Sequence, residues 1–149
     1  MVQASPEECF ATICDFSAYP KWATGVRRTH VRELDGEGRP KLVEFELEIP
    51  LRTVRYVLEY SYEPPRRLRW RSVEGDVDSI EGEYVFDPEP DGSTRATCRQ
   101  AVSLGFWIPG FLRERLEKEA LKRSVLEFRQ EAERRKRRAR SKKKSTGKA

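Results

Sequence analysis

The sequence predicts an α+β domain in which a curved antiparallel sheet wraps around one long C-terminal helix. Three observations indicate this fold class. Apolar and polar residues alternate over residues 26–103, which is typical of strands that bury one face. A helical spacing of apolar residues follows Pro109–Gly110 and continues for roughly 25 residues. The chain has 149 residues, of which 37% are apolar and 37% are charged, so we expect one core with a densely charged surface.

Two short helices are expected near the N-terminus. Ser5 is placed to cap the first helix, Pro6 stands at its first position, and Glu8 completes a capping box with Ser5. Apolar residues continue with helical spacing as far as Phe16. Tyr19–Pro20 then interrupts the helix, because a residue before proline avoids the α conformation, and a second short helical turn follows.

The alternating region divides into strands at turn-forming residues. Asp35–Gly38, Pro50, Pro64–Pro65, Gly75 and Pro88–Gly92 interrupt the alternation. Because the connections between successive strands are short, we predict an antiparallel meander with one buried face. The residues expected on that face are Val43, Phe45, Leu47, Ile49, Val54, Tyr56, Leu58, Tyr60, Tyr62, Leu68, Trp70, Ile80, Gly82, Tyr84, Phe86, Ala96, Cys98, Gln100 and Val102.

One long helix is expected to cover the apolar face of the sheet, since it is the only predicted element of sufficient size. Glu114 with Lys118 and Arg115 with Glu119 are spaced to pair on its charged face. Its apolar stripe consists of Leu112, Leu116, Ala120, Leu121, Val125, Phe128 and Ala132.

Charge divides the chain into two regions. Residues 134–149 hold ten basic residues and no acidic one, which leaves 20 basic and 25 acidic residues in residues 1–133. We therefore expect an acidic domain over residues 1–133 and a basic, largely disordered tail over residues 134–149, in which the helical register continues only briefly before Ser141. The acidic balance of the domain argues against a nucleic-acid-binding face on it.

The sequence carries no catalytic, metal-binding or cofactor motif. His30, the single histidine, is expected at the surface and has no serine–acid pattern nearby. Cys9, Cys14 and Cys98 are expected to be reduced structural thiols in the cytoplasm, since no signal-peptide pattern is present. One histidine and three scattered cysteines do not give metal-ligand spacing, and Asp35–Gly38 does not precede a helix as a nucleotide-binding loop would. We therefore expect no metal and no cofactor.

The predicted inner face of the sheet is rich in hydroxyl groups. Tyr56, Tyr60, Tyr62 and Tyr84 all belong to it. A buried tyrosine needs a partner for its O–H, so these residues indicate either many internal hydrogen bonds or a cavity whose occupant completes them. The pattern alone leaves both interpretations open.

Several segments are shared with a known family. The most specific is Asp15-Phe16-Ser17-Ala18-Tyr19-Pro20-Lys21-Trp22. Others are Ala4–Phe10, Gly38–Pro40, Gly82–Tyr84, Asp91–Arg95 and Ile108–Leu112. In these segments the chain resembles the START-like superfamily, also called SRPBCC, in its bacterial polyketide cyclase/dehydrase-like (coenzyme Q-binding START-type) branch. The resemblance implies the helix-grip fold of START-like and Bet v 1-like proteins. It also implies a first strand before the first helix, where only residues 1–3 are present, so we expect that strand to be truncated and one sheet edge to be unpaired.

The resemblance favours a cavity that binds a small hydrophobic molecule, such as a lipid, a quinone or a polyketide-like compound, between the sheet and the last helix. The leading hypothesis is non-enzymatic binding or carriage. The candidate ligand-binding residues are Phe45, Tyr56, Tyr60, Tyr62, Trp70, Tyr84, Gln100, Leu116, Ala120 and Phe128.

Two alternative functions stay open. The first is a polyketide cyclase or aromatase, whose catalysis by substrate positioning would leave little motif in the sequence. The second is an interaction protein that docks to a membrane or to the ribosome through residues 134–149. Because the tail lacks aromatic residues, its contact with anionic lipid or RNA is expected to be weak, salt-sensitive and without specificity for a nucleic acid sequence.

Overall fold

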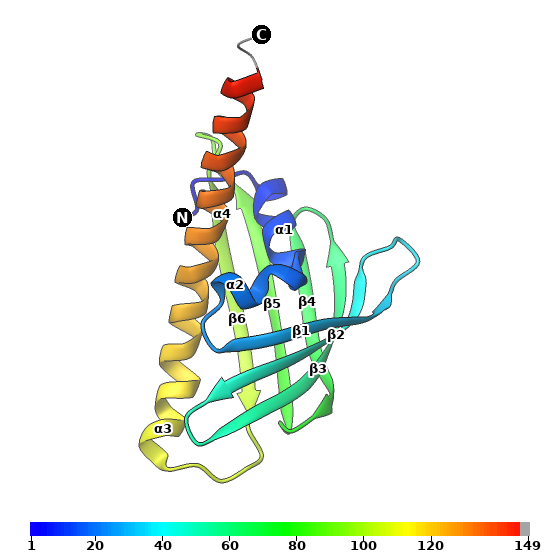
Figure 1. The fold of residues 1–149 in the computed structure, drawn as a ribbon, viewed down its shortest axis with the longest axis vertical. Helices are drawn as coiled ribbons and strands as arrows, with labels where there is room; N and C mark the ends of the chain where they lie inside the picture. The colour runs from blue at the N-terminus through cyan, green and yellow to red at the C-terminus, as the bar shows by residue number, and fades with distance from the viewer. Residues whose placement is uncertain (147–149) are drawn as a thin grey trace.

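The computed structural model describes residues 1–146, with side chains except at position 117 and at positions 143–146. Figure 1 shows a sheet with helices on one of its faces. The elements in chain order are α1 (Pro6–Cys14), η1 (Phe16–Ala18), α2 (Tyr19–Trp22), β1 (Val26–Leu34), β2 (Pro40–Ile49), β3 (Arg52–Glu63), β4 (Arg67–Gly75), β5 (Ser79–Pro88), β6 (Thr94–Ser103), α3 (Gly110–Glu114), η2 (Arg115–Glu119) and α4 (Ala120–Thr146).

The sheet is an antiparallel meander with the strand order β1-β2-β3-β4-β5-β6, as the short connections predicted. It curves around α4, with α1, η1 and α2 on the same concave side (Figure 1). The predicted α+β helix-grip fold is therefore confirmed. On the outer face, Glu44, Glu46 and Glu48 form ion pairs with arginines of β1 and β3, so this face is covered by charge.

The first helix begins as the capping box predicted. The Glu8 backbone N–H donates to Ser5 Oγ at 3.1 Å, and the Ser5 N–H donates to Glu8 Oε1 at 2.9 Å. Together these bonds satisfy two backbone donors that the helix leaves unpaired. Thr29 of β1 then donates from its hydroxyl to the Phe16 carbonyl at 2.7 Å, which fixes η1 against the sheet.

Residues before α1 pair with the sheet at one point. Val2 and Thr94 exchange backbone hydrogen bonds of 2.8 and 2.9 Å, and the Thr94 hydroxyl donates to the Ala4 carbonyl at 2.7 Å. In the described part of the chain, no other residue outside β5 pairs with the backbone of β6 as a strand partner. Most of the β6 edge therefore keeps free backbone donors and acceptors.

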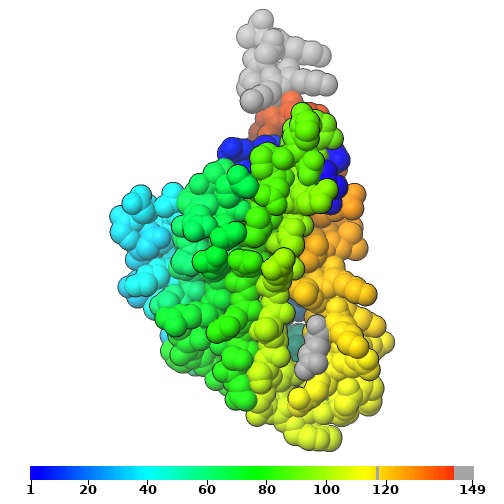
Figure 2. Space-filling view, turned by 180° about the vertical axis from the view of Figure 1, so that it is seen from behind, coloured from blue at the N-terminus to red at the C-terminus, as the bar shows by residue number. Residues whose placement is uncertain are grey.

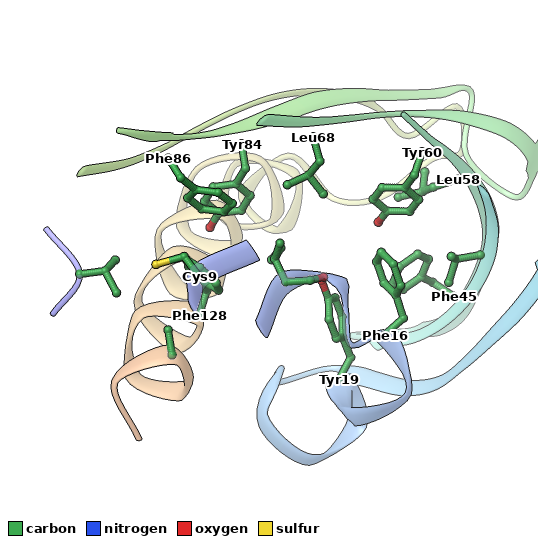
Figure 3. Packing of buried hydrophobic residues seen from close by; sticks show 14 of the residues in the cluster. Cys9, Phe16, Tyr19, Phe45, Leu58, Tyr60, Leu68, Tyr84, Phe86 and Phe128 are labelled. Atoms are coloured by element: carbon green, nitrogen blue, oxygen red, sulfur yellow. The ribbon is translucent and has the colours of Figure 1, made fainter. Parts of the chain in front are cut away.

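Aromatic residues form the centre of the core (Figure 3). Phe16 of η1 packs on Tyr60 of β3 with ring centroids 4.7 Å apart, and Tyr84 of β5 packs on Phe128 of α4 at 5.1 Å. Each buried ring of this kind stabilises the fold by roughly 1.5–3 kcal/mol relative to exposure. These contacts fasten the N-terminal helices and α4 to the concave face of the sheet.

The last helix differs from the prediction in two ways. Arg115–Glu119 forms a π-helical turn between α3 and α4, which adds one residue to the helix at this point. The expected pairs of Glu114 with Lys118 and of Arg115 with Glu119 are present at 3.1 and 3.7 Å.

Second, α4 continues to Thr146, past the boundary at residue 133 and through most of the segment for which the sequence predicted disorder. Two facts account for the longer helix. Arginine and lysine favour helical backbone, and Arg135 forms an ion pair with Asp15 at 3.0 Å that joins α4 to the end of α1. Residues 147–149 of the predicted tail lie outside the described residues. Within residues 1–146, no helix combines the length and apolar character needed to cross a membrane.

Candidate functional site

A cavity of about 430 Å³ lies between the concave face of the sheet and the α2 and α4 helices. Most of its wall is aliphatic or aromatic. All the candidate ligand-binding residues except Tyr62 belong to its lining, namely Phe45, Tyr56, Tyr60, Trp70, Tyr84, Gln100, Leu116, Ala120 and Phe128.

Tyr62 lies outside the cavity. Its hydroxyl donates to the Pro40 carbonyl, and its ring meets Phe10 edge-on at 5.9 Å. The alternation placed Tyr62 on the correct face of β3, but α1 covers that end of the strand. Tyr62 therefore joins the sheet to α1 and does not face the cavity, whereas Tyr60 does.

The cavity wall carries hydroxyl groups of two kinds. The hydroxyls of Tyr60 and Tyr84 point away from the sheet into the interior (Figure 3). Tyr84 lies opposite Cys98 of β6 and interacts with its thiol, whereas Tyr56 and Tyr60 have no hydrogen-bond partner among the described residues. Burial raises the pKa of both Tyr56 and Tyr60 well above the ordinary value of a phenol. They are therefore neutral donors at physiological pH.

A tryptophan–glutamine pair forms the part of the wall nearest β6. Trp70 Nε1 donates to Gln100 Oε1 at 3.0 Å. The indole lies flat over Gly82, where a Cβ atom would come within 2.5 Å of the ring. Glycine at this position is thus what allows Trp70 to lie against the sheet.

Trp22 of α2 contributes its ring to the wall. It lines the cavity, and its ring centroid is 4.8 Å from that of Tyr19. Its Nε1 atom is buried and has no hydrogen-bond partner in the part of the chain that the structure describes. The sequence identified Trp22 as part of the family segment but not as a site residue, because a short helix gives no periodicity from which its face could be predicted.

Polar residues gather where the α2–β1 connection meets α4. Thr24 donates to Glu127 from its backbone N–H at 3.0 Å and from its hydroxyl at 2.6 Å, and Arg123 lies 3.9 Å from the same carboxylate. Glu48 also belongs to the lining, next to Gly25, whose carbonyl accepts from the Glu48 backbone N–H at 2.8 Å, while its side chain pairs with Arg27 on the outer face at 3.0 Å. Sequence reasoning missed this rim. The only available signal was that Glu127 lies next to the apolar stripe of the helix.

The cavity also has an opening between β6 and the beginning of α4. Figure 2 shows a gap there, through which atoms of elements deeper in the molecule are visible. Gln100 lies on the adjacent edge strand and is exposed. Deeper parts of the molecule are therefore visible from this side, between the sheet and α4.

Other polar groups offer no site of a different kind. His30 is exposed on β1, as predicted, and Cys9, Cys14 and Cys98 are free thiols. No cluster of three or more histidine, cysteine or carboxylate side chains that could hold a metal ion occurs among the described residues. The cavity is accordingly the candidate functional site.

The chain is similar in fold to several solved structures. A START superfamily protein from Mycobacterium smegmatis aligns with a TM-score of 0.79 and 21% identity, over 89% of this chain and 92% of that one. The Zhui aromatase/cyclase from Streptomyces sp. R1128 aligns with a TM-score of 0.67 and 20% identity, over 90% of each chain. A STAR-related lipid transfer protein from Xanthomonas axonopodis aligns with a TM-score of 0.67 and 14% identity, over 88% and 81%. At these identities the likeness establishes the fold alone.

Sequence comparison gives the family. No curated protein sequence matched the chain. The family model described as polyketide cyclase/dehydrase and lipid transport matches residues 1–140, which is nearly the whole chain. The chain therefore belongs to the polyketide cyclase/dehydrase and lipid transport family, as the shared segments of its sequence predicted.

Proposed function

We propose that this protein binds and carries a small hydrophobic molecule of lipid, quinone or polyketide-like chemistry, without catalysing a reaction. The observation that carries the proposal is the cavity of about 430 Å³ with a mainly aromatic and aliphatic wall. Its volume is in the range of small-molecule pockets, which are typically apolar with a few fixed polar groups. The candidate residues other than Tyr62 act together as that wall.

The polar groups of the wall specify the chemistry of the ligand further. Tyr56 and Tyr60 each present a hydroxyl donor to the cavity without a partner among the described residues. A ligand with carbonyl, quinone or hydroxyl oxygens would accept from these donors. An ionised carboxylate deep in the cavity is disfavoured, because an apolar wall does not replace the water that a charge loses.

Native mass spectrometry of the purified protein tests this proposal directly. We expect a bound mass that organic extraction removes, and we expect the emptied protein to take up one equivalent of a short-chain ubiquinone or a fluorescent fatty acid. A protein that carries no extractable mass and takes up neither probe would contradict the proposal.

Cyclisation of a polyketide is the second candidate function, and the tyrosine donors favour it because they could polarise ketone oxygens. Such a reaction also needs a base to remove a proton from carbon. Of the described carboxylates of lining residues, that of Glu48 pairs with Arg27 on the outer face, and that of Glu127 is at the rim and accepts from Thr24. Binding without catalysis is therefore better supported. Ring products from a poly-β-ketone, formed faster with the native protein than with Tyr60→Phe, would favour the enzyme instead.

Docking through the basic tail is the third candidate. Arg134, Arg135 and Arg138, with Lys21, line a cleft of about 690 Å³ beside α4, where basic residues outnumber acidic ones. The acidic residues of this cleft, Glu131 and Asp15, form ion pairs with Arg134 and Arg135. Retention of RNA or anionic vesicles at low salt, lost in a variant with Arg137→Gln, Arg138→Gln and Arg140→Gln, would support this role. We place the protein in the cytoplasm, and its three free cysteines support a reducing setting.

A further inference from the structure

Three large apolar side chains are exposed at one end of the molecule, and we call this surface the apolar tip. Trp107 is 82% exposed, Leu51 is 76% exposed and Phe111 is 70% exposed. They come from the loop between β6 and α3, from the β2–β3 turn, and from α3. Apolar residues gathered in this way on a surface indicate an interaction site, because each of them costs free energy in contact with water.

Contacts between the loops join the tip into one surface. The Arg52 guanidinium, next to Leu51 in sequence, lies 4.3 Å from the centroid of the Phe106 ring. Arg113 of α3 donates to the Phe106 carbonyl at 3.4 Å. Figure 1 shows the β2–β3 turn beside α3, at the end of the molecule opposite to the C-terminus.

Leu51 holds its exposed position at a conformational cost. Its φ angle is +82°, in the left-handed region that favours glycine or asparagine. The preceding Pro50 makes this the turn position at which glycine is the usual residue. A protein with glycine at this position would therefore be at least as stable as the native protein. The contribution to folding stability thus does not explain why leucine stands here.

The charge beside the tip identifies its partner. Arg52 and Arg113 are exposed, and neither forms an ion pair with a described carboxylate. Exposed tryptophan and phenylalanine next to unpaired arginines fit the headgroup region of a phospholipid bilayer, where rings enter the acyl boundary and guanidinium groups meet phosphate. A purely apolar partner would leave the two arginines without a counter-charge.

The tip also adjoins the cavity. Leu104, Ile108 and Leu112 form a small buried cluster beneath it, separate from the main core. Leu104 lines the cavity, as do Val77, Val102 and Leu116, which pack against this cluster. Leu104 thus places this cluster at an end of the cavity.

We propose that the apolar tip docks on a phospholipid bilayer containing anionic lipid, and that the cavity exchanges its occupant with the bilayer at this end. The docking is independent of the function proposed above, whereas the exchange rests on it. Trp107 and Phe111 insert, Arg52 and Arg113 contact phosphate, and the small cluster separates the bilayer from the cavity.

Flotation of the full-length protein with vesicles of phosphatidylcholine and phosphatidylglycerol tests docking. We expect binding that persists in part at 0.5 M salt, since salt screens the tail but not apolar insertion. The double variant Trp107→Ser, Phe111→Ser should lower the partition coefficient by about tenfold or more. The matched control is Leu34→Ser, which removes an apolar residue that is 57% exposed but distant from the tip.

Leu51→Gly separates docking from a structural role. Because glycine relieves the left-handed strain, this variant should unfold at equal or higher denaturant concentration and yet bind vesicles more weakly. Unchanged vesicle binding in both tip variants would assign the binding to the tail and overturn the proposal. A concentration-dependent dimer that the double variant abolishes, with no vesicle binding, would overturn it in favour of an interface between two copies.

Exchange is tested with a fluorescent fatty acid loaded into the same vesicles. We expect the native protein to extract the probe and the double variant to bind it from solution but to extract it slowly. Docking without uptake of the probe from either source would contradict exchange and the proposed function together, while docking itself would stand. Equal extraction rates for the two proteins would contradict exchange at the tip alone.

Discussion

The tyrosines of the inner wall differ in what their hydroxyls do. Tyr62 donates to the Pro40 carbonyl and thereby connects two parts of the fold. Tyr60 is buried but has no partner among the described residues. A hydroxyl that faces the cavity without a protein partner adds little to the stability of the fold, whereas a paired one contributes about 1 kcal/mol. The two residues should therefore respond differently to loss of the hydroxyl.

Tyr60→Phe should leave the free energy of unfolding unchanged or raise it, and should weaken binding of an oxygen-bearing ligand by about fivefold to tenfold. Tyr62→Phe should lower the free energy of unfolding by about 1 kcal/mol and leave affinity unchanged. Urea unfolding and a ligand titration measure the two effects. An equal loss of stability in both variants would show that the Tyr60 hydroxyl is paired after all.

Gly82→Ala should destabilise the fold by about 1–3 kcal/mol, because the new methyl group overlaps the Trp70 ring and forces it away from Gln100. Gly36→Ala is the control, since no atom lies within 4 Å of its added Cβ. Thermal unfolding and the tryptophan fluorescence spectrum report both variants. If Gly82→Ala were as stable as Gly36→Ala, the packing of Trp70 on the sheet would not be required.

Among the elements, the strands were the most predictable. Their alternation has a strict period of two, so a turn residue such as Pro88 or Gly92 marks a boundary and the faces follow from counting. The bulge between Val57 and Leu58 and the π turn at Arg115–Glu119 were not predicted. Each inserts one extra residue into an otherwise regular element. The sequence does not indicate at which of several neighbouring positions the extra residue lies.

The rim of the site could not be predicted for a different reason. Thr24 and Glu127 are 103 residues apart and meet only because α4 crosses the α2–β1 connection. Neither residue belongs to a periodic apolar pattern that would reveal its neighbour. The sequence thus predicted the wall of the cavity, which consists of regular elements, and missed the residues that close it.

Ala120→Phe on α4 should fill part of the cavity and reduce ligand uptake by about tenfold or more, with a change of at most about 1–3 kcal/mol in stability. Ala101→Phe is the matched control, because Ala101 is exposed on β6 outside the cavity lining. Titration with the fluorescent fatty acid gives both affinities. Equal uptake by the two variants would locate the ligand elsewhere.

At the scale of the whole molecule, buried acids make the fold sensitive to alkali. Burial raises the pKa of Cys9 and of Cys98 from 9.0 to about 11, and that of Cys14 to about 12. Above pH 9 the unfolded chain loses these protons while the folded chain keeps them. The stability they contribute is therefore fully present below pH 9 and is lost as pH rises towards 11 and 12.

The urea midpoint should accordingly be constant between pH 7 and pH 8.5 and should fall between pH 9 and pH 11. Cys98→Ser removes one of the three thiols and keeps a polar partner for Tyr84. The urea midpoint of this variant should therefore fall less steeply with pH than that of the native protein. A midpoint that stays flat to pH 11 in the native protein would mean that these thiols ionise as easily in the folded chain as in the unfolded one.

The length of the helix that begins at α3 has a consequence for where the two ends of the protein act. Gly110 and Arg134 are separated by about 36 Å along a helix that rises 1.5 Å per residue. In physiological salt, charges are screened beyond about 8 Å. A bilayer touched by Trp107 and Phe111 would therefore not feel the arginines at the far end of α4. Those arginines would remain available to a second, anionic surface, so that the helix would act as a spacer holding two surfaces at a fixed separation.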